Sequence, residues 1–373
     1  MRFLKLANDG VQSLSPYQPG KPAEELQREL GLSKIIKLAS NENPLGPSAK
    51  VSQAVQRALN GLSRYPDGNG FRLKQALSER LGVDAAQITL GNGSNDVLEI
   101  IPRVFADRKS EIIFSEYAFA VYPIAVKAVG ARAVVTCARR EDYGHDPEAM
   151  ISAVTPLTKI MFIANPNNPT GTWLNKKELT ALLEQVPATV IVVLDEAYKE
   201  YVREPTYPNG LDFLERYPNV IVTGTFSKVW GMAGLRLGYA ISHPDIADLL
   251  NRVRQPFNVN GLAQEAALGV LEDEEYLQKS IEINDQGLMQ LAQGINGLDL
   301  NFIPSVANFI TFKVGGNAES VFEALLRKGV IVRPLASYQM PEHLRVSVGL
   351  KEENSFFLST LKGVLAQEPN QKS

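Results

Sequence analysis

Apolar runs of strand length, separated by stretches of helix length, constrain the fold of this 373-residue chain most. Several of these runs are apolar without interruption, which is typical of strands that helices cover on both faces of a sheet. The expected strands are Ile88–Leu90, Glu111–Phe114, Arg132–Thr136, Ile160–Ala164, Val190–Leu194, Val220–Thr223 and Leu237–Ile241, and the expected helices between them include Ser48–Leu59, Phe71–Leu81 and Lys176–Gln185. This alternation predicts an α/β protein with a doubly wound, mostly parallel sheet.

Both ends of the chain depart from the alternation. Prolines and glycines interrupt residues 1–35, so we expect an irregular N-terminal arm with one short helix over Ala23–Leu30. A large domain is expected over residues 36–257, and a smaller α+β domain over residues 258–373. The elements expected in the smaller domain are a long helix over Leu262–Leu291, strands over Phe309–Val314, Val330–Arg333 and Leu344–Val348, and helices over Ala318–Lys328 and Glu353–Ala366.

Composition argues against several classes of protein. The net charge is −3 with both signs mixed along the chain, so no basic face for nucleic acid is expected. No apolar run reaches the roughly 18 residues of a membrane span, and the apolar stretch at the N-terminus is too short for a signal peptide. The single cysteine, Cys137, fits a reducing cytoplasm. The three histidines, His145, His243 and His343, have no metal-ligand spacing, so no metal is expected.

Polar residues follow three of the expected strands. Asn168 lies in a rigid loop, Asn165–Gly171, Asp195 directly follows Val190–Leu194, and Lys228 comes after Val220–Thr223. Ligands bind at the carboxyl ends of strands in open α/β sheets. Each residue alone has a simpler explanation, because a lysine is usually solvated, an acid after a strand often caps a helix and an Asn-Pro pair often forms a turn.

Taken together, these residues match the needs of one cofactor. Pyridoxal phosphate requires a lysine that forms a Schiff base, an acid for the pyridinium nitrogen and cationic groups for the phosphate. Lys228, Asp195 and Arg236 supply these groups, and Asn168 and Tyr198 are placed to share the phenolic oxygen. The sequence therefore predicts a pyridoxal-phosphate site.

A phosphate site is also expected where Gly91–Asp96 meets the start of a helix, because N–H groups at a helix N-terminus bind phosphate. The segment is half of a dinucleotide fingerprint, but Asp96 stands where the third glycine belongs, which weakens a nicotinamide-binding interpretation. A plain turn before a helix is the alternative. Thr225, Ser227 and Arg236 add two hydroxyls and a guanidinium suited to the same phosphate.

Three further residues are candidates. Phe119 is placed to stack on a planar ring, although a core aromatic explains it equally well. Arg333 and Arg345 lie on short strands of the smaller domain, where a charged residue usually marks the solvated face. The functional alternative is that both arginines reach into the cleft between the domains and bind substrate anions.

These motifs resemble those of the fold-type I pyridoxal-phosphate aminotransferases over essentially the whole chain. Within that group the details resemble the histidinol-phosphate aminotransferases. The matching segments are Leu14–Gln18, Leu38–Gly46, Arg64–Asp67, Asn165–Gly171, Asp195–Tyr198, Thr225–Arg236 and His343–Gly349. Two positions depart from the usual pattern, because Phe119 replaces a tyrosine and Glu116–Ala118 lacks the usual proline.

The resemblance implies roles for individual residues. Lys228, Asp195 and Tyr198 are the catalytic residues, and Arg345 binds the carboxylate of the amino-acid substrate while Arg333 lies near the substrate phosphate. Tyr65 reaches the cofactor phosphate from the other subunit, and Tyr17 touches substrate across the dimer, with Asn43 also at the substrate. The residues implied to bind the cofactor are Ser94, Asn95, Phe119, Asn168, Asp195, Tyr198, Thr225, Ser227, Lys228, Arg236 and Tyr65.

The activity that the resemblance implies is transamination between L-histidinol phosphate and 2-oxoglutarate in histidine biosynthesis, by a homodimer with shared active sites. Aminotransferases of aromatic amino acids and decarboxylases of threonine phosphate share much of the pattern and stay open as alternatives. A non-catalytic regulator that binds the cofactor is a further alternative, against which the lack of a basic cluster and of an extra N-terminal domain argues.

Overall fold

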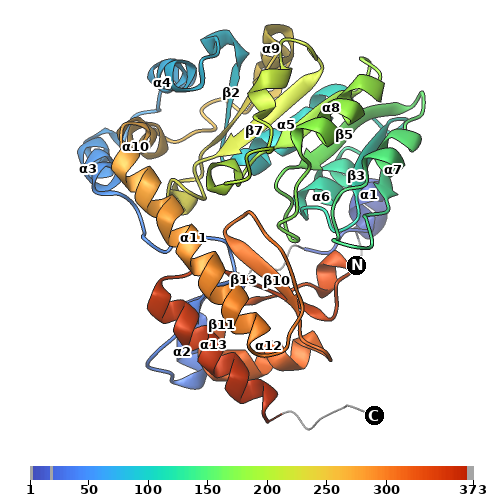
Figure 1. Cartoon of the computed structure of the whole chain (residues 1–373). Coiled ribbons are helices and arrows are strands. Elements are labelled where there is room, and N and C mark those ends of the chain that lie inside the picture. The colour runs from blue at the N-terminus through green and yellow to red at the C-terminus, as the bar shows by residue number, and fades with distance from the viewer. Residues whose placement is uncertain (1–2, 17–19, 368–373) are drawn as a thin grey trace.

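The computed structural model describes residues 3–16 and 20–367 (Figure 1). The helices are α1 (Asp9–Gln12), α2 (Ala23–Leu30), α3 (Ala49–Ala58), α4 (Phe71–Leu81), α5 (Ser94–Phe105), α6 (Val121–Ala128), α7 (Pro147–Ser152), α8 (Lys176–Gln185), α9 (Pro244–Val253), α10 (Gly261–Leu271), α11 (Glu274–Asn296), α12 (Ala318–Arg327) and α13 (Lys351–Leu365). The strands are β1 (Ile36–Lys37), β2 (Ile88–Gly91), β3 (Glu111–Ser115), β4 (Arg132–Thr136), β5 (Thr158–Ala164), β6 (Ile191–Asp195), β7 (Val220–Thr225), β8 (Gly238–Ser242), β9 (Phe302–Ile303), β10 (Phe309–Lys313), β11 (Val330–Ile331), β12 (Arg333–Pro334) and β13 (His343–Ser347). Short 3₁₀ helices include η1 (Leu4–Leu6), η4 (Lys199–Tyr201) and η7 (Ala336–Tyr338).

The larger part of the molecule is built on a seven-stranded sheet in the order β2-β8-β7-β6-β5-β3-β4. Strand β8 runs antiparallel to both of its neighbours, and the other neighbouring strands pair in parallel. The prediction of an α/β fold with a mostly parallel sheet is confirmed. The carboxyl ends of β5, β6 and β7 consequently meet at one edge of the sheet.

Helices cover both faces of this sheet. Side chains alternate along β5, so Phe162 packs with α5, α6 and α9 on one face while Met161 and Ile163 pack with α7 and α8 on the other. All three side chains are almost fully buried. This burial on both faces explains why the strand reads as an uninterrupted apolar run in the sequence.

A second, four-stranded antiparallel sheet has the order β12-β13-β10-β9 and shares its core with α11, α12 and α13. Helix α11 starts beside α10 and continues to α13, which links the two parts of the molecule (Figure 1). Strand β1 pairs with β11 in parallel, so residues soon after the N-terminal arm contact the smaller domain. The domain limits at residues 35/36 and 257/258 stay predictions.

Two expected elements are wrong in their extent. The helix expected over Leu262–Leu291 is two helices, α10 and α11, because the chain breaks at Asp273, whose carboxylate caps the start of α11. The strand expected over Val330–Arg333 is divided between β11 and β12, which belong to two different sheets. An apolar run alone does not reveal that its residues change sheet.

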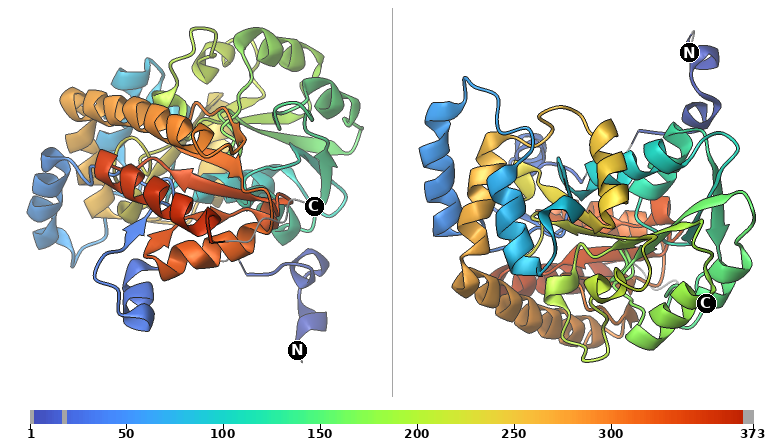
Figure 2. Two further views of the ribbon diagram at one scale, coloured as in Figure 1. Left: turned by 60° about the horizontal axis from the view of Figure 1, so that its bottom comes forward. Right: turned by 90° about the horizontal axis from the view of Figure 1, so that it is seen from above.

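The first helices of the N-terminal arm lie at the outer margin of the molecule. Figure 2 shows η1 and α1 there, and α1 lies beside α6, where the Asn8 amide donates to the Ala128 carbonyl at 3.4 Å. Over residues 3–16 and 20–367, no helix is long and apolar enough to cross a membrane.

Close packing of β8 against the start of α5 gives the first prediction. A Cβ atom added at Gly238 would lie 2.3 Å from the Ser94 nitrogen and 2.6 Å from the Gly93 carbonyl carbon, and backbone atoms there cannot move aside cheaply. Gly238→Ala is therefore expected to lower the free energy of unfolding by about 1–3 kcal/mol, measured by urea denaturation.

Gly363→Ala is the matched control, because no heavy atom lies within 4 Å of the added Cβ and Gly363 lies inside α13. It should leave stability unchanged or raise it by up to about 1 kcal/mol. Equal stability of Gly238→Ala and the wild type would contradict the packing described here.

Candidate functional site

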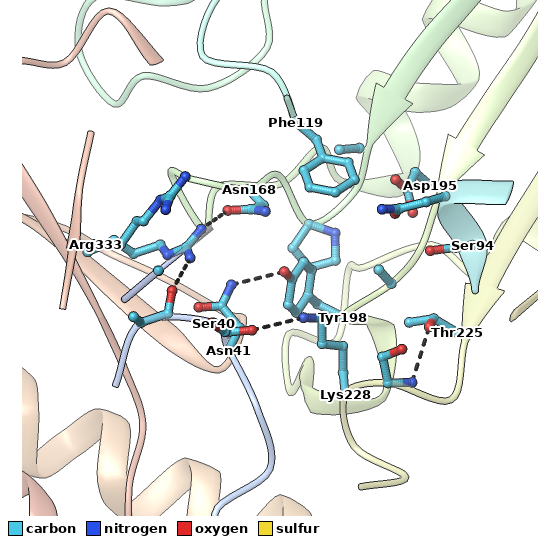
Figure 3. A pocket seen from close by; sticks show the side chains of 18 of the residues that line it. Ser40, Asn41, Ser94, Phe119, Asn168, Asp195, Tyr198, Thr225, Lys228 and Arg333 are labelled. Carbon is cyan, nitrogen blue, oxygen red and sulfur yellow. Dashed lines mark hydrogen bonds between the residues drawn. The ribbon is translucent and has the colours of Figure 1, made fainter. Parts of the chain in front are cut away.

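A cavity of about 180 Å³ lies at the carboxyl ends of β5, β6 and β7, between the large sheet and the smaller domain (Figure 3). Twelve of the residues predicted from the sequence line it: Ser94, Asn95, Phe119, Asn168, Asp195, Tyr198, Thr225, Ser227, Lys228, Arg236, Arg333 and Arg345. They come from segments that are up to 251 residues apart in the sequence (345 − 94). The fold therefore brings together nearly the whole predicted set.

Asp195 ends β6 and is 4% exposed. Its Oδ2 accepts a hydrogen bond from the Tyr122 hydroxyl at 2.8 Å, and its Oδ1 accepts one from the Thr223 hydroxyl at 3.2 Å. Burial raises the pKa of the Asp195 carboxyl, and the two hydrogen bonds partly offset this shift. A cationic ligand next to Asp195 would favour the charged carboxylate further.

Phe119 forms part of the cavity wall near Asp195 (Figure 3). The Phe119 ring meets the Tyr122 ring edge-on at 5.9 Å, and Tyr122 in turn stacks on Phe162 at 4.7 Å. The aromatic wall is thus anchored in the core beneath the sheet, and it offers a flat ligand a rigid surface.

Lys228 follows β7, and its Nζ donates to the Ser40 carbonyl at 3.2 Å. Burial lowers the pKa of the Lys228 amine to about 8, and the positive charge of Arg345 contributes to the shift. An amine with this pKa is neutral in a substantial fraction of molecules near pH 8, which suits it to act as a nucleophile or a base.

One end of the cavity is suited to an anion. Ser94 and Asn95 form the first turn of the 12-residue helix α5, and Arg236 donates to the Ser227 hydroxyl at 3.2 Å. The Ser227 backbone N–H donates to Thr225 Oγ1 at 3.1 Å. Hydroxyls, a guanidinium and a helix N-terminus together are the donors that a phosphate accepts from.

A glycine is required beside this end of the cavity. A Cβ atom at Gly93, where φ is +85°, would lie 2.3 Å from Arg236 Nη2. Only a residue without a side chain lets the guanidinium approach the start of α5 so closely.

Arg345 reaches from β13 to the opposite side of the cavity. Its Nη1 donates to Asn168 Oδ1, and its Nη2 donates to the Ala39 carbonyl at 2.8 Å. Because Asn168 Oδ1 accepts from Arg345, the Asn168 amide nitrogen is left to donate to a ligand. Arg345 Nε is buried without a hydrogen-bond partner among the described residues, and Arg333 lies close by in the cavity wall.

Tyr198 is buried beside the edge of the Phe309 ring, at 5.4 Å between centroids. Its hydroxyl oxygen accepts a hydrogen bond from the Asn41 amide at 3.0 Å, drawn in Figure 3. Burial raises the pKa of the Tyr198 hydroxyl to about 12, so the group keeps its proton at neutral pH.

Of the three remaining predicted residues, two do not line the cavity and the third lies outside the described residues. Tyr17 lies outside the described residues. Tyr65 is 82% exposed, stacks on Phe257 at 4.6 Å and is not part of the cavity wall of its own chain. The Asn43 amide donates to the Val229 carbonyl at 2.8 Å and to Ser280 Oγ at 2.9 Å, so this side chain holds the loop together. The substrate contact expected of Asn43 stays a prediction.

Sequence reasoning missed several residues at the cavity: Ser40, Asn41 and Tyr338 in its wall, and Tyr122 and Thr223 behind Asp195. Asn41 stands in the same segment as Asn43, and only the left-handed turn at Asn41, with φ of +54°, decides which of the two asparagines faces Tyr198. Tyr122 falls on a helical turn after Phe119, but nothing in the sequence pairs it with Asp195.

Among residues 3–16 and 20–367, no group of three or more histidine, cysteine, aspartate or glutamate side chains is arranged to hold a metal ion.

Comparison with known proteins places the chain among aminotransferases. The family described as "Aminotransferase class I and II" matches residues 33–356. Histidinol-phosphate aminotransferase 2 of Pseudomonas aeruginosa is 56% identical over 368 residues, which cover 98% of this chain and 99% of that protein. Histidinol-phosphate aminotransferase 1 of Nitrosococcus oceani is 54% identical over 365 residues, 98% of each chain. The crystal structure of histidinol-phosphate aminotransferase from Sinorhizobium meliloti in complex with pyridoxal-5'-phosphate is similar with a TM-score of 0.87 and 27% identity, covering 97% of this chain and 98% of that one.

The depressed pKa of Lys228 gives a prediction for the protein without any ligand. Competitive labelling with acetic anhydride, read by mass spectrometry of the peptide that carries Lys228, should show a labelling rate that rises with pH around a midpoint of about 8. The reason is that only the neutral amine reacts. A midpoint at the ordinary lysine value of about 10.4 would contradict the environment described for Lys228.

Proposed function

The chain belongs to the class I and II aminotransferases and, within them, to the histidinol-phosphate aminotransferases, and from this we propose that it transfers an amino group between L-histidinol phosphate and 2-oxoglutarate. It is a pyridoxal-phosphate-dependent transaminase of histidine biosynthesis, and the products are imidazole-acetol phosphate and L-glutamate. One observation carries the proposal: a single buried cavity holds Lys228, Asp195 and a cluster of anion-binding groups.

The residues of the cavity fit pyridoxal phosphate. The proposed roles are that Lys228 binds it covalently, Asp195 accepts from the pyridinium N–H and Phe119 stacks on the ring, and the support is that all three line one cavity. Arg345 fixes the orientation of the Asn168 amide so that its nitrogen can donate to the phenolic oxygen, which Tyr198 shares. The proposed phosphate ligands are Ser94, Asn95, Thr225, Ser227, Arg236 and, from a partner subunit, Tyr65. The bound cofactor supplies an electron sink for the charge that develops on the substrate carbon.

The amine of Lys228 is the proposed acid and base of the reaction. With the cofactor bound, this amine would take the proton from the amine-bearing carbon of the substrate and hold it for return, as a general base and then a general acid. Its pKa of about 8 before cofactor binding reflects surroundings that keep the amine neutral enough for this transfer. The main contributor is burial, which excludes water from the path of the proton.

Asp195 is proposed to keep the ring nitrogen protonated. A carboxylate with two hydroxyl donors stays ionised more readily than a bare buried acid, so it favours a positive charge next to it. That positive charge makes the ring a stronger electron sink. The role assigned to Asp195 is electrostatic, and the carboxylate does not itself transfer the proton.

The two substrates bring different anions to the same site. We propose that Arg333 lies near the phosphate of histidinol phosphate and that Arg345 binds a carboxylate of 2-oxoglutarate or glutamate, with Tyr17 and Asn43 as further substrate contacts. Arg345 uses two of its five N–H donors within the chain and its Nε is buried, so two Nη donors are left for a carboxylate. A carboxylate can therefore bind to Arg345 while the hydrogen bond from Arg345 to Asn168 stays in place.

We propose that the enzyme is a homodimer with shared active sites. Tyr65 and Phe257 form a stacked pair on the surface, 82% and 45% exposed, close in sequence to other exposed apolar side chains: Leu59, Leu62 and Phe71. Exposed apolar side chains of this size favour burial against a partner. In a two-fold dimer each Tyr65 can complete the partner's site, because an isologous contact occurs twice.

The cellular location is also proposed, as cytoplasmic. The support is that the sole cysteine, Cys137, is exposed and forms no disulfide. No nucleic acid or membrane partner is proposed, and the partners of the enzyme are its small-molecule substrates and a second copy of the chain.

A panel of amines on the purified holoenzyme tests the proposed substrate. Histidinol phosphate should convert the absorption of the bound cofactor in a single turnover at least ten times faster than phenylalanine or tyrosine, because a cationic cavity favours a substrate phosphate. Threonine phosphate should release no carbon dioxide. Faster conversion by the aromatic amino acids, or decarboxylation of threonine phosphate, would replace the proposed activity with one of these alternatives.

Mixed dimers test the shared active site. Lys228→Ala and Tyr65→Ala are each expected to lose most activity as homodimers. After the two are refolded together, one of the two sites in each mixed dimer receives intact Lys228 and intact Tyr65, so part of the activity should return. The measurement is turnover of isolated mixed dimers that carry two different affinity tags.

The matched control combines Lys228→Ala with Asp195→Ala. Both residues line the cavity of one chain, so every site in this mixed dimer lacks one of them and no activity should return. Recovery in the control, or none in the Tyr65 mixture, would mean that the subunits do not share sites in the proposed way.

A further inference from the structure

Asn41 connects the smaller domain to the hydroxyl of Tyr198. It lies in the loop after β1 and is almost fully buried, and its amide Nδ2 donates to the Tyr198 hydroxyl oxygen at 3.0 Å. Two residues of the smaller domain hold it in place. The Asn41 backbone N–H donates to Ser347 Oγ at 2.8 Å, and Asn308 Nδ2 donates to the Asn41 carbonyl at 3.0 Å.

Ser347 determines which way the Asn41 amide points. Because Ser347 Oγ accepts the Asn41 backbone N–H, its own hydrogen is left to donate to Asn41 Oδ1, at 3.0 Å. If the amide were turned over, Ser347 would face a second donor and the Asn41 oxygen would face Tyr198. In the observed arrangement each donor meets an acceptor, so the amide N–H is directed at Tyr198.

The direction of the Asn41 amide sets the direction of the tyrosine proton. A phenol oxygen that accepts a hydrogen bond on one side directs its own O–H away from that donor. We propose that Asn41 is a positioning residue that aims the Tyr198 O–H at the phenolic oxygen of the cofactor. This inference rests on the proposed function, in which Tyr198 contacts that oxygen.

Strand β13 orients both donors to this oxygen. Arg345 and Ser347 are two residues apart on β13, so their side chains lie on the same face of the strand. Arg345 turns the Asn168 amide, and Ser347, through Asn41, turns the Tyr198 hydroxyl. One strand of the smaller domain thus determines the direction of two hydrogen-bond donors of the large domain, the Asn168 amide and the Tyr198 hydroxyl.

A purely structural role for Asn41 is the competing explanation. Its φ of +54° is a conformation that few residues other than asparagine and glycine adopt, and in this explanation asparagine serves the turn alone. Glycine adopts this conformation without strain. Asn41→Gly therefore keeps the turn and removes only the amide, which separates the two explanations.

The test is a spectroscopic pH titration of the bound cofactor without substrate. A hydrogen bond to an anionic oxygen stabilises the anion. Losing this bond therefore raises the pH midpoint at which the visible absorption of the bound cofactor changes. Tyr198→Phe should raise this midpoint by about one unit or more. Asn41→Gly should raise it by at least half as much, and Ser347→Ala should shift it in the same direction by less.

The double variant distinguishes aiming from an independent effect. In Tyr198→Phe the amide has no hydroxyl to direct, so adding Asn41→Gly should produce no further shift. Additive shifts would overturn the proposal. Ser280→Ala is the matched control, since it removes a hydrogen bond from Asn43 in the same loop without touching Tyr198, and its midpoint should equal that of the wild type.

The titration distinguishes the proposed role of Asn41 from the proposed contact between Tyr198 and the cofactor. A shift in Tyr198→Phe with none in Asn41→Gly would overturn the role of Asn41 and leave the proposed function intact. No shift in Tyr198→Phe would show that Tyr198 does not contact the phenolic oxygen, which overturns both the role of Asn41 and that part of the proposed site. An equal shift in Ser280→Ala would mean that the loop, and not the amide, is responsible.

Discussion

The buried carboxylate of Asp195 is the constraint on which the arrangement of the site depends. A carboxylate at the end of a central strand, shielded from water, is costly unless donors or a cation face it. Tyr122 and Thr223 supply two donors from the helix and strand that flank it, and in the proposed function the pyridinium of the cofactor would supply the cation. The same tyrosine contacts Phe119, so the acid and the aromatic wall are fixed by one side chain. Cofactor binding and local stability are therefore linked at this position.

The smaller domain orients hydrogen-bonding groups that belong to the cavity. Arg345 and Ser347 make hydrogen bonds that determine the direction of amide and hydroxyl groups elsewhere, and such directional control is what an electrostatically organised site requires. It also explains why Arg345 is buried on a strand that sequence patterns would assign to a solvated face. Two N–H groups hold the cavity wall, and the remaining Nη donors are the proposed contacts to a substrate anion.

The sequence predicted the large sheet and most of the cavity because both follow from local rules. A strand covered by helices on both faces is apolar throughout, and in a parallel sheet Asp195 and the loops that carry Asn168 and Lys228 must reach the same edge. Features that depend on tertiary contacts were not accessible in this way. The break at Asp273 needs a cap that the periodicity of the helix does not show, and the division between β11 and β12 depends on which sheet each strand joins. Asn41 and Asn43 are indistinguishable by composition, and only the backbone turn assigns one to Tyr198 and the other to the loop.

The central claim is that Lys228 is the residue that binds pyridoxal phosphate covalently. The most direct measurement is reduction of the holoenzyme with sodium borohydride, followed by proteolysis and mass spectrometry of the modified peptide. The account predicts a single pyridoxyl adduct, on Lys228, with no other lysine modified in stoichiometric amounts. An adduct on Lys199, which follows Asp195 by four residues and pairs with Glu196 at 3.2 Å, or on any other lysine in place of Lys228, would contradict it.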